Sequence, residues 1–201
     1  MYRPVLVTPA DPIVTVAQAM RQCRIDADAL DAVALAEVTA LLEGYIAAAT
    51  VLLEGWNGIL GGLCLGFQTW RQDYDDISRC LPLPLAPVTD ITSVTWRDSA
   101  GQESTISPAE YSLRTASYGQ SVCRFRNAYA LPTDLYEVGA VSVTYQAGYA
   151  IVPAPIVQAI LLCVGAWYQN REEAVIGTIA ASLPQAVAVD RLIGAYKRVE
   201  L

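Results

Sequence analysis

The spacing of apolar residues changes twice along this chain. From about Thr15 to Glu54 apolar residues recur every three or four positions, and from Phe67 to Tyr149 they alternate with polar ones. After Pro155 the spacing of three and four returns. The first pattern is that of a helix with one buried face, and the second is that of a half-buried strand. The sequence therefore predicts an α+β fold, in which a small antiparallel β module is inserted into a helical bundle.

Two helices are predicted before the β module. Thr15 and Gln18 have the spacing of a capping box, in which each side chain satisfies a backbone N–H group of the first turn, and this helix runs to about Cys23. Asp26 or Asp28 then caps a second, long helix that ends near Glu54. Apolar residues surround most of this second helix, so we expect it to be covered on more than one side.

The β module is predicted from short alternating segments around Trp70, Val94 and Val143. Asp98–Gly101 suits a hairpin connection, because glycine adopts positive φ without strain. The proline-rich stretch 81–87 is expected to be an extended connector, since proline lacks a backbone donor for a central strand. A small sheet needs a surface that covers one of its faces. We therefore expect residues 67–150 not to be stable on their own.

Helical spacing after Pro155 predicts a third helix, and residues 170–181 are expected to form a linker. Ser182–Gln185 repeats the capping pattern and predicts a last helix that can move away from the bundle. Its apolar stripe and the basic pair behind it are Leu192, Ile193, Tyr196, Lys197 and Arg198. The expected organisation is residues 1–66 for the N-terminal helices, 67–150 for the β module, 151–183 for the third helix and linker, and 184–201 for a C-terminal segment.

Composition excludes several function classes. The 201 residues contain no histidine, which removes histidine bases, histidine nucleophile pairs and histidine metal ligands. The net charge of −7 has the wrong sign for holding nucleic acid through its phosphates. The chain is 54% hydrophobic, yet its apolar stretches are interrupted by Glu43, Glu54, Pro153 and Pro155. We therefore expect no membrane span, and assign the excess apolar surface to the interfaces of an obligate oligomer. We also expect no targeting segment, because prolines interrupt MYRPVLVTPADP at the start of the chain, where a signal peptide is apolar.

Few residues suggest chemistry. Asp73, Asp75 and Asp76 could hold a cation or act as acid and base, and a carboxylate-dependent hydrolase that uses Asp73 and Asp75 is one alternative reading. A solvated strand end explains this cluster more simply. The remaining acids 26, 28 and 31 suit helix capping, the glycines of 58–62 lack the spacing of a phosphate loop, and the five cysteines lack that of a zinc site. We expect no catalytic residue, no metal and no cofactor.

Six segments in order carry a resemblance to a known family. They are QTWR (68–71), LPLPLAPV (81–88), ITSVTWRDSAG (91–101), VSVTYQAGYA (141–150), WYQNRE (167–172) and RLIGAYKR (191–198). Together they resemble the head–tail connector (adaptor) proteins of long-tailed bacteriophages and of the related gene transfer agents. The resemblance covers about residues 15–198.

This resemblance implies a structural protein of a phage-like particle, at the head–tail junction. It implies a ring of about twelve copies under the portal, through which DNA passes without specific binding. It also implies two partners: the portal, which would receive the C-terminal stripe and basic pair described above, and a tail-side neck protein such as a stopper. Another ring component of the neck, a stopper or a tail terminator, is the second reading within the same class.

Overall fold

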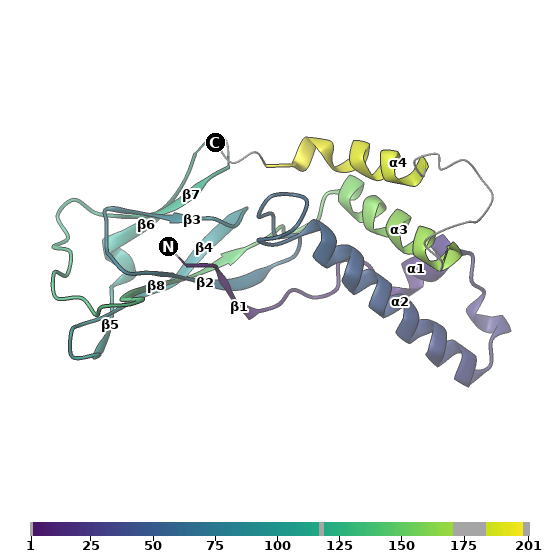
Figure 1. Cartoon of the computed structure of the whole chain (residues 1–201), viewed down its shortest axis with the longest axis horizontal. Coiled ribbons are helices and arrows are strands. Elements are labelled where there is room, and N and C mark those ends of the chain that lie inside the picture. Colours follow the sequence, from purple (N-terminus) through teal and green to yellow (C-terminus); the bar gives the residue numbers. More distant parts are fainter. Residues whose placement is uncertain (1, 117–118, 171–183, 199–201) are drawn as a thin grey trace. The chain divides into compact units, whose positions relative to one another are not determined.

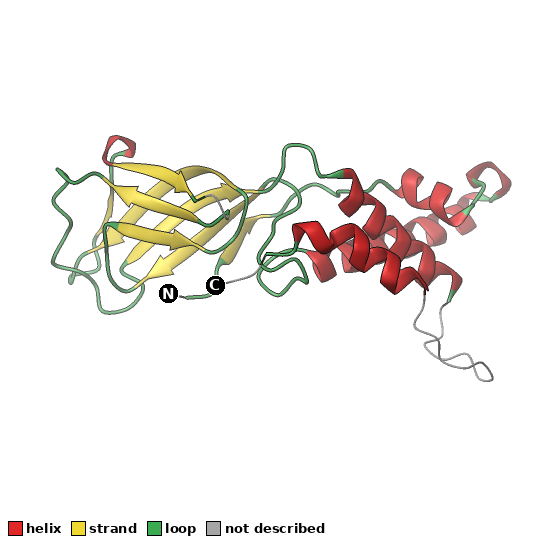
Figure 2. Ribbon diagram, turned by 90° about the horizontal axis from the view of Figure 1, so that it is seen from above, coloured by secondary structure: helices red, strands yellow, loops and turns green. Residues whose placement is uncertain are grey.

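The computed structural model describes residues 2–116, 119–170 and 184–198. The chain divides into two compact units. One comprises Met1–Asp11 and Gly62–Ala150, and the other comprises Pro12–Gly61 and Ile151–Leu201. The strands lie in the first unit and the α-helices in the second (Figure 2). This confirms the predicted α+β class.

Within the described residues, eight strands form two antiparallel sheets (Figure 1). The larger sheet has the order β1-β2-β8-β4-β5, and the smaller has the order β3-β7-β6. The strands are β1 (Val5–Thr8), β2 (Gln68–Tyr74), β3 (Cys80–Leu83), β4 (Val88–Arg97), β5 (Glu103–Thr105), β6 (Tyr111–Thr115), β7 (Ser121–Phe125) and β8 (Val141–Ala147).

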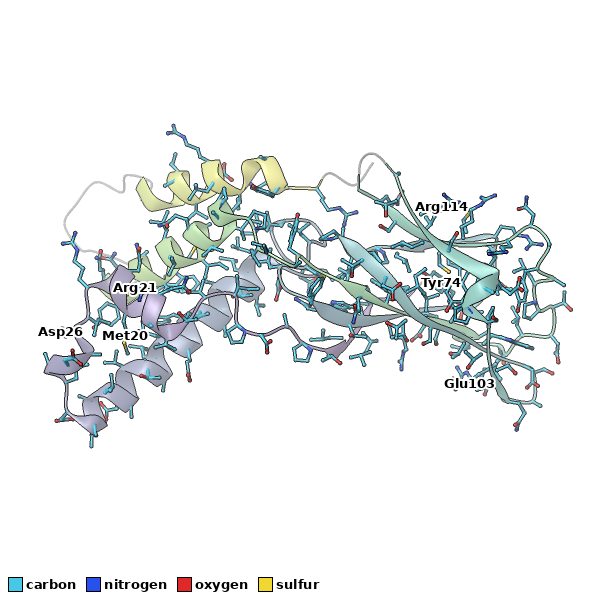
Figure 3. All side chains as sticks on the ribbon, turned by 180° about the vertical axis from the view of Figure 1, so that it is seen from behind. Met20, Arg21, Asp26, Tyr74, Glu103 and Arg114 are labelled. Atoms are coloured by element: carbon cyan, nitrogen blue, oxygen red, sulfur yellow. The ribbon has the colours of Figure 1, made fainter. Side chains whose placement is uncertain are left out.

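The two sheets share one hydrophobic core. Tyr74 and Tyr145 contribute to it from the larger sheet, and Leu83 and Phe125 contribute from the smaller one. The Tyr74 hydroxyl, labelled in Figure 3, donates a hydrogen bond to the Pro82 carbonyl. The smaller sheet thus covers one face of the larger sheet and supplies the partner surface that a small sheet needs. The sequence did not distinguish one sheet from two.

The N-terminal residues belong to the β unit and not to the helices. Val5 pairs with Arg71 and Leu6 pairs with Trp70, which places β1 at an edge of the larger sheet. The predicted boundary of an N-terminal helical segment over residues 1–66 is therefore wrong at both ends, because the helical unit begins at Pro12 and its first part ends at Gly61.

The proline-rich stretch begins as a strand, which corrects the expected connector. Cys80–Leu83 pairs with β7, and Pro82 lies opposite Val122. Proline is tolerated here because β3 is the edge strand of its sheet, so its missing N–H group costs no ladder bond on the free side.

The helical unit contains α1 (Val16–Cys23), α2 (Ala32–Leu53), α3 (Ala154–Gln169) and α4 (Pro184–Ile193). The predicted capping box at Thr15 is confirmed: the Gln18 N–H donates to Thr15 Oγ1 at 3.3 Å, and the Thr15 N–H donates to Gln18 Oε1 at 2.8 Å. The long helix begins later than expected. Asp26 caps a short 3-10 turn, and Asp31 caps α2 by accepting from the Ala34 N–H at 2.8 Å.

The helices pack through one face of α2. Leu42, Ile46, Ala49 and Leu53 are buried on that face, and at its flank Tyr45 meets Trp167 of α3 edge-on, with ring centroids 6.1 Å apart. The opposite face of α2 is exposed. The expectation that this helix is covered on more than one side is therefore not met within one chain.

The length and hydropathy of α2 also satisfy the criteria for a membrane-crossing helix. Its 18-residue window has a mean hydropathy of 1.5, and 17% of that window is buried. The core helix of a soluble protein can satisfy the same criteria. Acidic residues interrupt this apolar stretch, which is why the sequence predicts no span.

Candidate functional site

The C-terminal segment, residues 192–198, is the candidate site that the sequence indicates. It comprises the end of α4 and one 3-10 turn, Gly194–Tyr196. α4 lies alongside α3 in the helical unit (Figure 1). Ile193 is only 2% exposed, whereas Leu192 and Tyr196 are half-buried. The stripe is therefore divided: Ile193 anchors α4 to its own unit, and its neighbours keep part of their surface.

Two contacts fix the basic end of this segment. Lys197 Nζ lies 2.5 Å from Oδ1 of Asp190, which is seven residues earlier, on α4. The Arg198 backbone N–H donates to the Leu60 carbonyl at 3.2 Å. Gly61 adopts a φ of +66°, and a Cβ atom on it would lie 2.7 Å from the Arg198 carbonyl oxygen. The glycine-rich turn after α2 therefore fits closely against the C-terminal segment, a role that its sequence did not reveal.

The sequence predicts a last helix that can move away from the bundle, whereas in the structure α4 contacts α3. The expected linker lies outside the described residues except for Asn170, and so does the Ser182 cap. A stripe at helical spacing indicates that a helix has a partner surface, but not which surface this is. Within the described residues, part of that surface is the chain's own helical unit.

Asp73 and Asp75, in the acidic cluster at the end of β2, form hydrogen bonds and an ion pair with neighbouring residues. Asp73 accepts a hydrogen bond from Ser142 Oγ at 2.7 Å and pairs with Arg71 Nε at 3.1 Å. Asp75 accepts from the Gly139 N–H at 2.8 Å and from the Tyr2 hydroxyl at 2.7 Å. These bonds stabilise the carboxylate and so lower the pKa of Asp75 below its ordinary value. The bond from the Gly139 N–H has the largest effect.

A polar hollow of about 570 Å³ lies over the outer face of the larger sheet. Its two arginines already have partners: Arg71 pairs with Asp73, and Arg97 donates to the Gly139 carbonyl at 2.9 Å while its guanidinium lies over the Tyr136 ring. Within residues 2–116, 119–170 and 184–198, no group of three His, Cys, Asp or Glu residues could hold a metal ion. The two arginines of this hollow are therefore held by contacts within the β unit.

The remaining acids that the sequence singled out, and two further residues, are placed as follows. Asp26 and Asp31 are helix caps, as predicted. Arg124 lies on β7, with its guanidinium 3.4 Å from Cys80 Sγ. Trp56, three residues after the end of α2, is 37% exposed.

Comparison with solved structures shows which fold this is. A chain in a structure described as the neck of an empty GTA particle computed with C6 symmetry matches with a TM-score of 0.76 and 20% identity, over 100% of this chain and 97% of that chain. A chain in the virion of a native gene transfer agent (GTA) particle matches with a TM-score of 0.65 and 19% identity, over 98% and 96%. A third, in the neck of a native GTA particle computed with C12 symmetry, has a TM-score of 0.64 and 22% identity, over 100% and 97%.

This chain shares its fold with those chains. The match spans both units, so the fold, including the inserted sheets, is common to them. No family model matches the sequence, and no curated protein matches it either. At identities of 19–22% the likeness is one of fold.

Proposed function

We propose that this protein is a structural head–tail connector, or adaptor, of a phage-like particle. It forms a ring under the portal, joins the capsid to the tail and surrounds part of the DNA channel. The observation that carries this proposal is the match of fold along the whole chain with chains from the particle and neck structures described above. The ordered sequence segments that resemble adaptors support it independently.

The physical properties of the chain suit this role. A net charge of −7 weakens adhesion to the phosphates of a passing duplex, which a conduit requires. Exposed apolar residues such as Val33, Val51 and Ile151 suit a subunit that is covered on several sides by neighbours. We propose a ring of about twelve copies, located at the head–tail junction of the particle.

We also propose that the C-terminal segment contacts the portal. Ile193 fixes the segment to its own unit, while Leu192, Tyr196, Lys197 and Arg198 form the contact. The side chain of Lys197 is 38% exposed although it is paired with Asp190. A half-exposed aromatic residue beside exposed positive charge suits an acidic groove on the partner.

The first experiment images the purified protein by negative stain with and without portal rings. An adaptor gives rings stacked on one face of the portal. A protein that leaves the portal bare and binds only tail-side neck components is a stopper or a tail terminator, and the adaptor assignment is then wrong.

The second experiment tests the segment with point variants. Removal of residues 184–201 would uncover the surface that buries Ile193, so Tyr196→Ala and Lys197→Glu are used instead. Arg191→Glu is the matched control, because Arg191 is exposed on α4 and its replacement makes the same charge change outside the proposed contact residues Leu192, Tyr196, Lys197 and Arg198. We expect the two test variants to lose portal binding with unchanged circular dichroism, and the control to retain it. Equal binding by all three would contradict the docking role.

A further inference from the structure

One face of α2 is an exposed stripe without charge. Its residues recur at steps of three and four and lie opposite the buried face of the helix. They are Val33, Ala36, Ala40, Gly44, Ala47 and Val51. Val33 and Val51, at the two ends, are 69% and 71% exposed. A surface helix normally presents charged and polar residues on its outer face, so this stripe indicates a surface that something covers.

The small size of these side chains favours close approach by another helix. No heavy atom of the described chain outside the local backbone lies within 4 Å of a Cβ atom built on Gly44. Helices pack with axes about 8–10 Å apart, and small residues at the contact allow the short end of that range. A stripe of small residues does not by itself identify its partner. The charges around it do.

The charges of the helical unit are separated between two helices. Glu37 and Glu43 flank the stripe on its two sides, and α2 contains no lysine or arginine. Arg21 lies on α1 (Figure 3), and Arg24 follows directly; both are exposed. Within the part of the chain that the structure describes, none of these four residues forms an ion pair.

We propose that the α2 stripe packs against the exposed α1 face of a second copy of this chain, with Glu37 and Glu43 meeting Arg21 and Arg24. Arginine stems cover apolar surface while their guanidinium groups reach carboxylates, so the basic face fits a stripe that has acids at its flanks. This proposal deepens the proposed function, on which it rests, by assigning the surface through which the ring closes.

The same charges argue against other occupants. Two α2 stripes packed on each other would bring Glu37 and Glu43 of both copies together, and like charges at a contact are unfavourable. A head-to-tail contact between different faces avoids this, and it is the kind of contact that closes into a ring. In a membrane, α2 would have acidic flanks at Asp31 and Glu54, whereas spanning helices have basic flanks and aromatic residues at the interfaces.

The test places a charge in the middle of the stripe. Gly44→Glu improves the helix propensity of an exposed position, so the fold should be retained. The control is Gln158→Glu, which adds a carboxylate at an exposed position of α3 in the same unit, outside both proposed contact faces. The self-association of the full-length protein is measured by analytical ultracentrifugation without portal, and circular dichroism checks the fold.

We expect the wild type to self-associate, and Gly44→Glu to raise the dissociation constant about tenfold or more because it buries an unpaired carboxylate. Gln158→Glu should remain within about twofold of the wild type, as surface substitutions usually do. Equal association by Gly44→Glu and the wild type overturns the proposal. A wild type that stays monomeric, or that instead binds phosphatidylcholine vesicles, overturns it too.

A charge exchange tests the assigned partner face. Glu37→Lys with Glu43→Lys should weaken association, and adding Arg21→Glu with Arg24→Glu in the same chain should restore it. Failure of the fourfold variant to recover overturns the pairing of α2 with α1. A protein that self-associates through α2 but does not bind the portal supports this inference and contradicts the proposed function. Failure of the inference and failure of the proposed function can therefore be told apart.

Discussion

Tyr2 donates a hydrogen bond from its hydroxyl to Asp75 Oδ1 at 2.7 Å, across a sequence separation of 73 residues. The Gln72 side chain donates to the Tyr2 carbonyl at 2.6 Å, and the Tyr2 N–H donates to the Asp73 carbonyl at 3.3 Å. The start of the chain is thus fixed to the end of β2. An acidic cluster that suggested a cation site or a solvated strand end instead holds the N-terminal strand in place.

This contact predicts an acid-dependent loss of stability. A carboxyl whose pKa is lower in the folded state than in the unfolded state, as for Asp75, adds stability above its unfolded pKa of about 3.9. That stability is lost as the pH falls through the lower, folded pKa. We expect the urea midpoint to fall from pH 5 to pH 2 by less in Asp75→Asn than in the wild type. The control is Asp76→Asn, at an exposed neighbour, and its urea midpoint should fall over this pH range by as much as that of the wild type. If the midpoint of Asp75→Asn also falls by as much as that of the wild type, the role of Asp75 is refuted.

The cysteines of the β unit should differ in reactivity. Cys123 is fully buried on β7, and burial raises the pKa of its thiol to about 12. Cys80 lies exposed on the neighbouring strand β3. Because thiolates are the reactive form, iodoacetamide at pH 8 should modify Cys80 and leave Cys123 intact until urea unfolds the protein. Mass spectrometry of the tryptic peptides measures both, and early modification of Cys123 would show that this core opens readily.

Two glycines provide a matched pair for stability. Gly44 lies exposed inside α2, so Gly44→Ala should raise the free energy of unfolding by about 0.5–1 kcal/mol. At Gly58 a Cβ atom would collide with the backbone carbonyls of Leu53 and Glu54, so Gly58→Ala should lower it by about 1 kcal/mol or more. Urea unfolding followed by circular dichroism at 222 nm checks both signs, and a neutral Gly58→Ala would mean that the turn rearranges.

The β unit should need its discontinuous pieces. Residues 67–150 alone lack β1 and also Cys64, which belongs to the shared core. We therefore expect this fragment to show no cooperative thermal transition. Met1–Asp11 joined by a glycine–serine linker to Gly62–Ala150 should show one, because it restores both pieces. Cooperative melting of the shorter fragment would prove the N-terminal strand dispensable.

The acidity of the chain predicts weak binding to duplex DNA. With 13 basic and 20 acidic residues, few phosphate contacts are available. We expect elution from a DNA column below about 0.2 M salt, where binding through few contacts is already lost. Retention above that concentration would contradict a channel that lets DNA slide.

Local signals were read correctly from the sequence. The capping box at Thr15 and the turn at Gly101, whose N–H donates to the Asp98 carbonyl at 2.8 Å, depend on residues within four positions. Capping as such was the correct role for Asp26 and Asp31, but the cap of the long helix was assigned to the wrong residue: Asp31 caps α2, whereas Asp26 caps the short 3-10 turn before it.

Long-range pairing was not readable in the same way. β1 was missed because it has only four residues and its partner around Arg71 lies more than sixty positions away. The signal that could have found it is the concentration of β-branched residues after Pro4, at Val5, Val7 and Thr8. In the C-terminal segment, the spacing of apolar residues identified the stripe. Only the structure shows that the chain itself covers Ile193 and leaves the rest of the stripe partly exposed.

The insertion of the β unit between α2 and α3 has a consequence during synthesis. α2 leaves the ribosome roughly a hundred residues before α3, the helix against which it packs, so at 5–20 residues per second it waits about 5–20 s for that partner. During this time only α1, which is made earlier, can pack against the face of α2 that α3 will bury. The nascent chain therefore exposes an apolar helix before its partner surface is complete, and exposed apolar surface of this kind favours premature association.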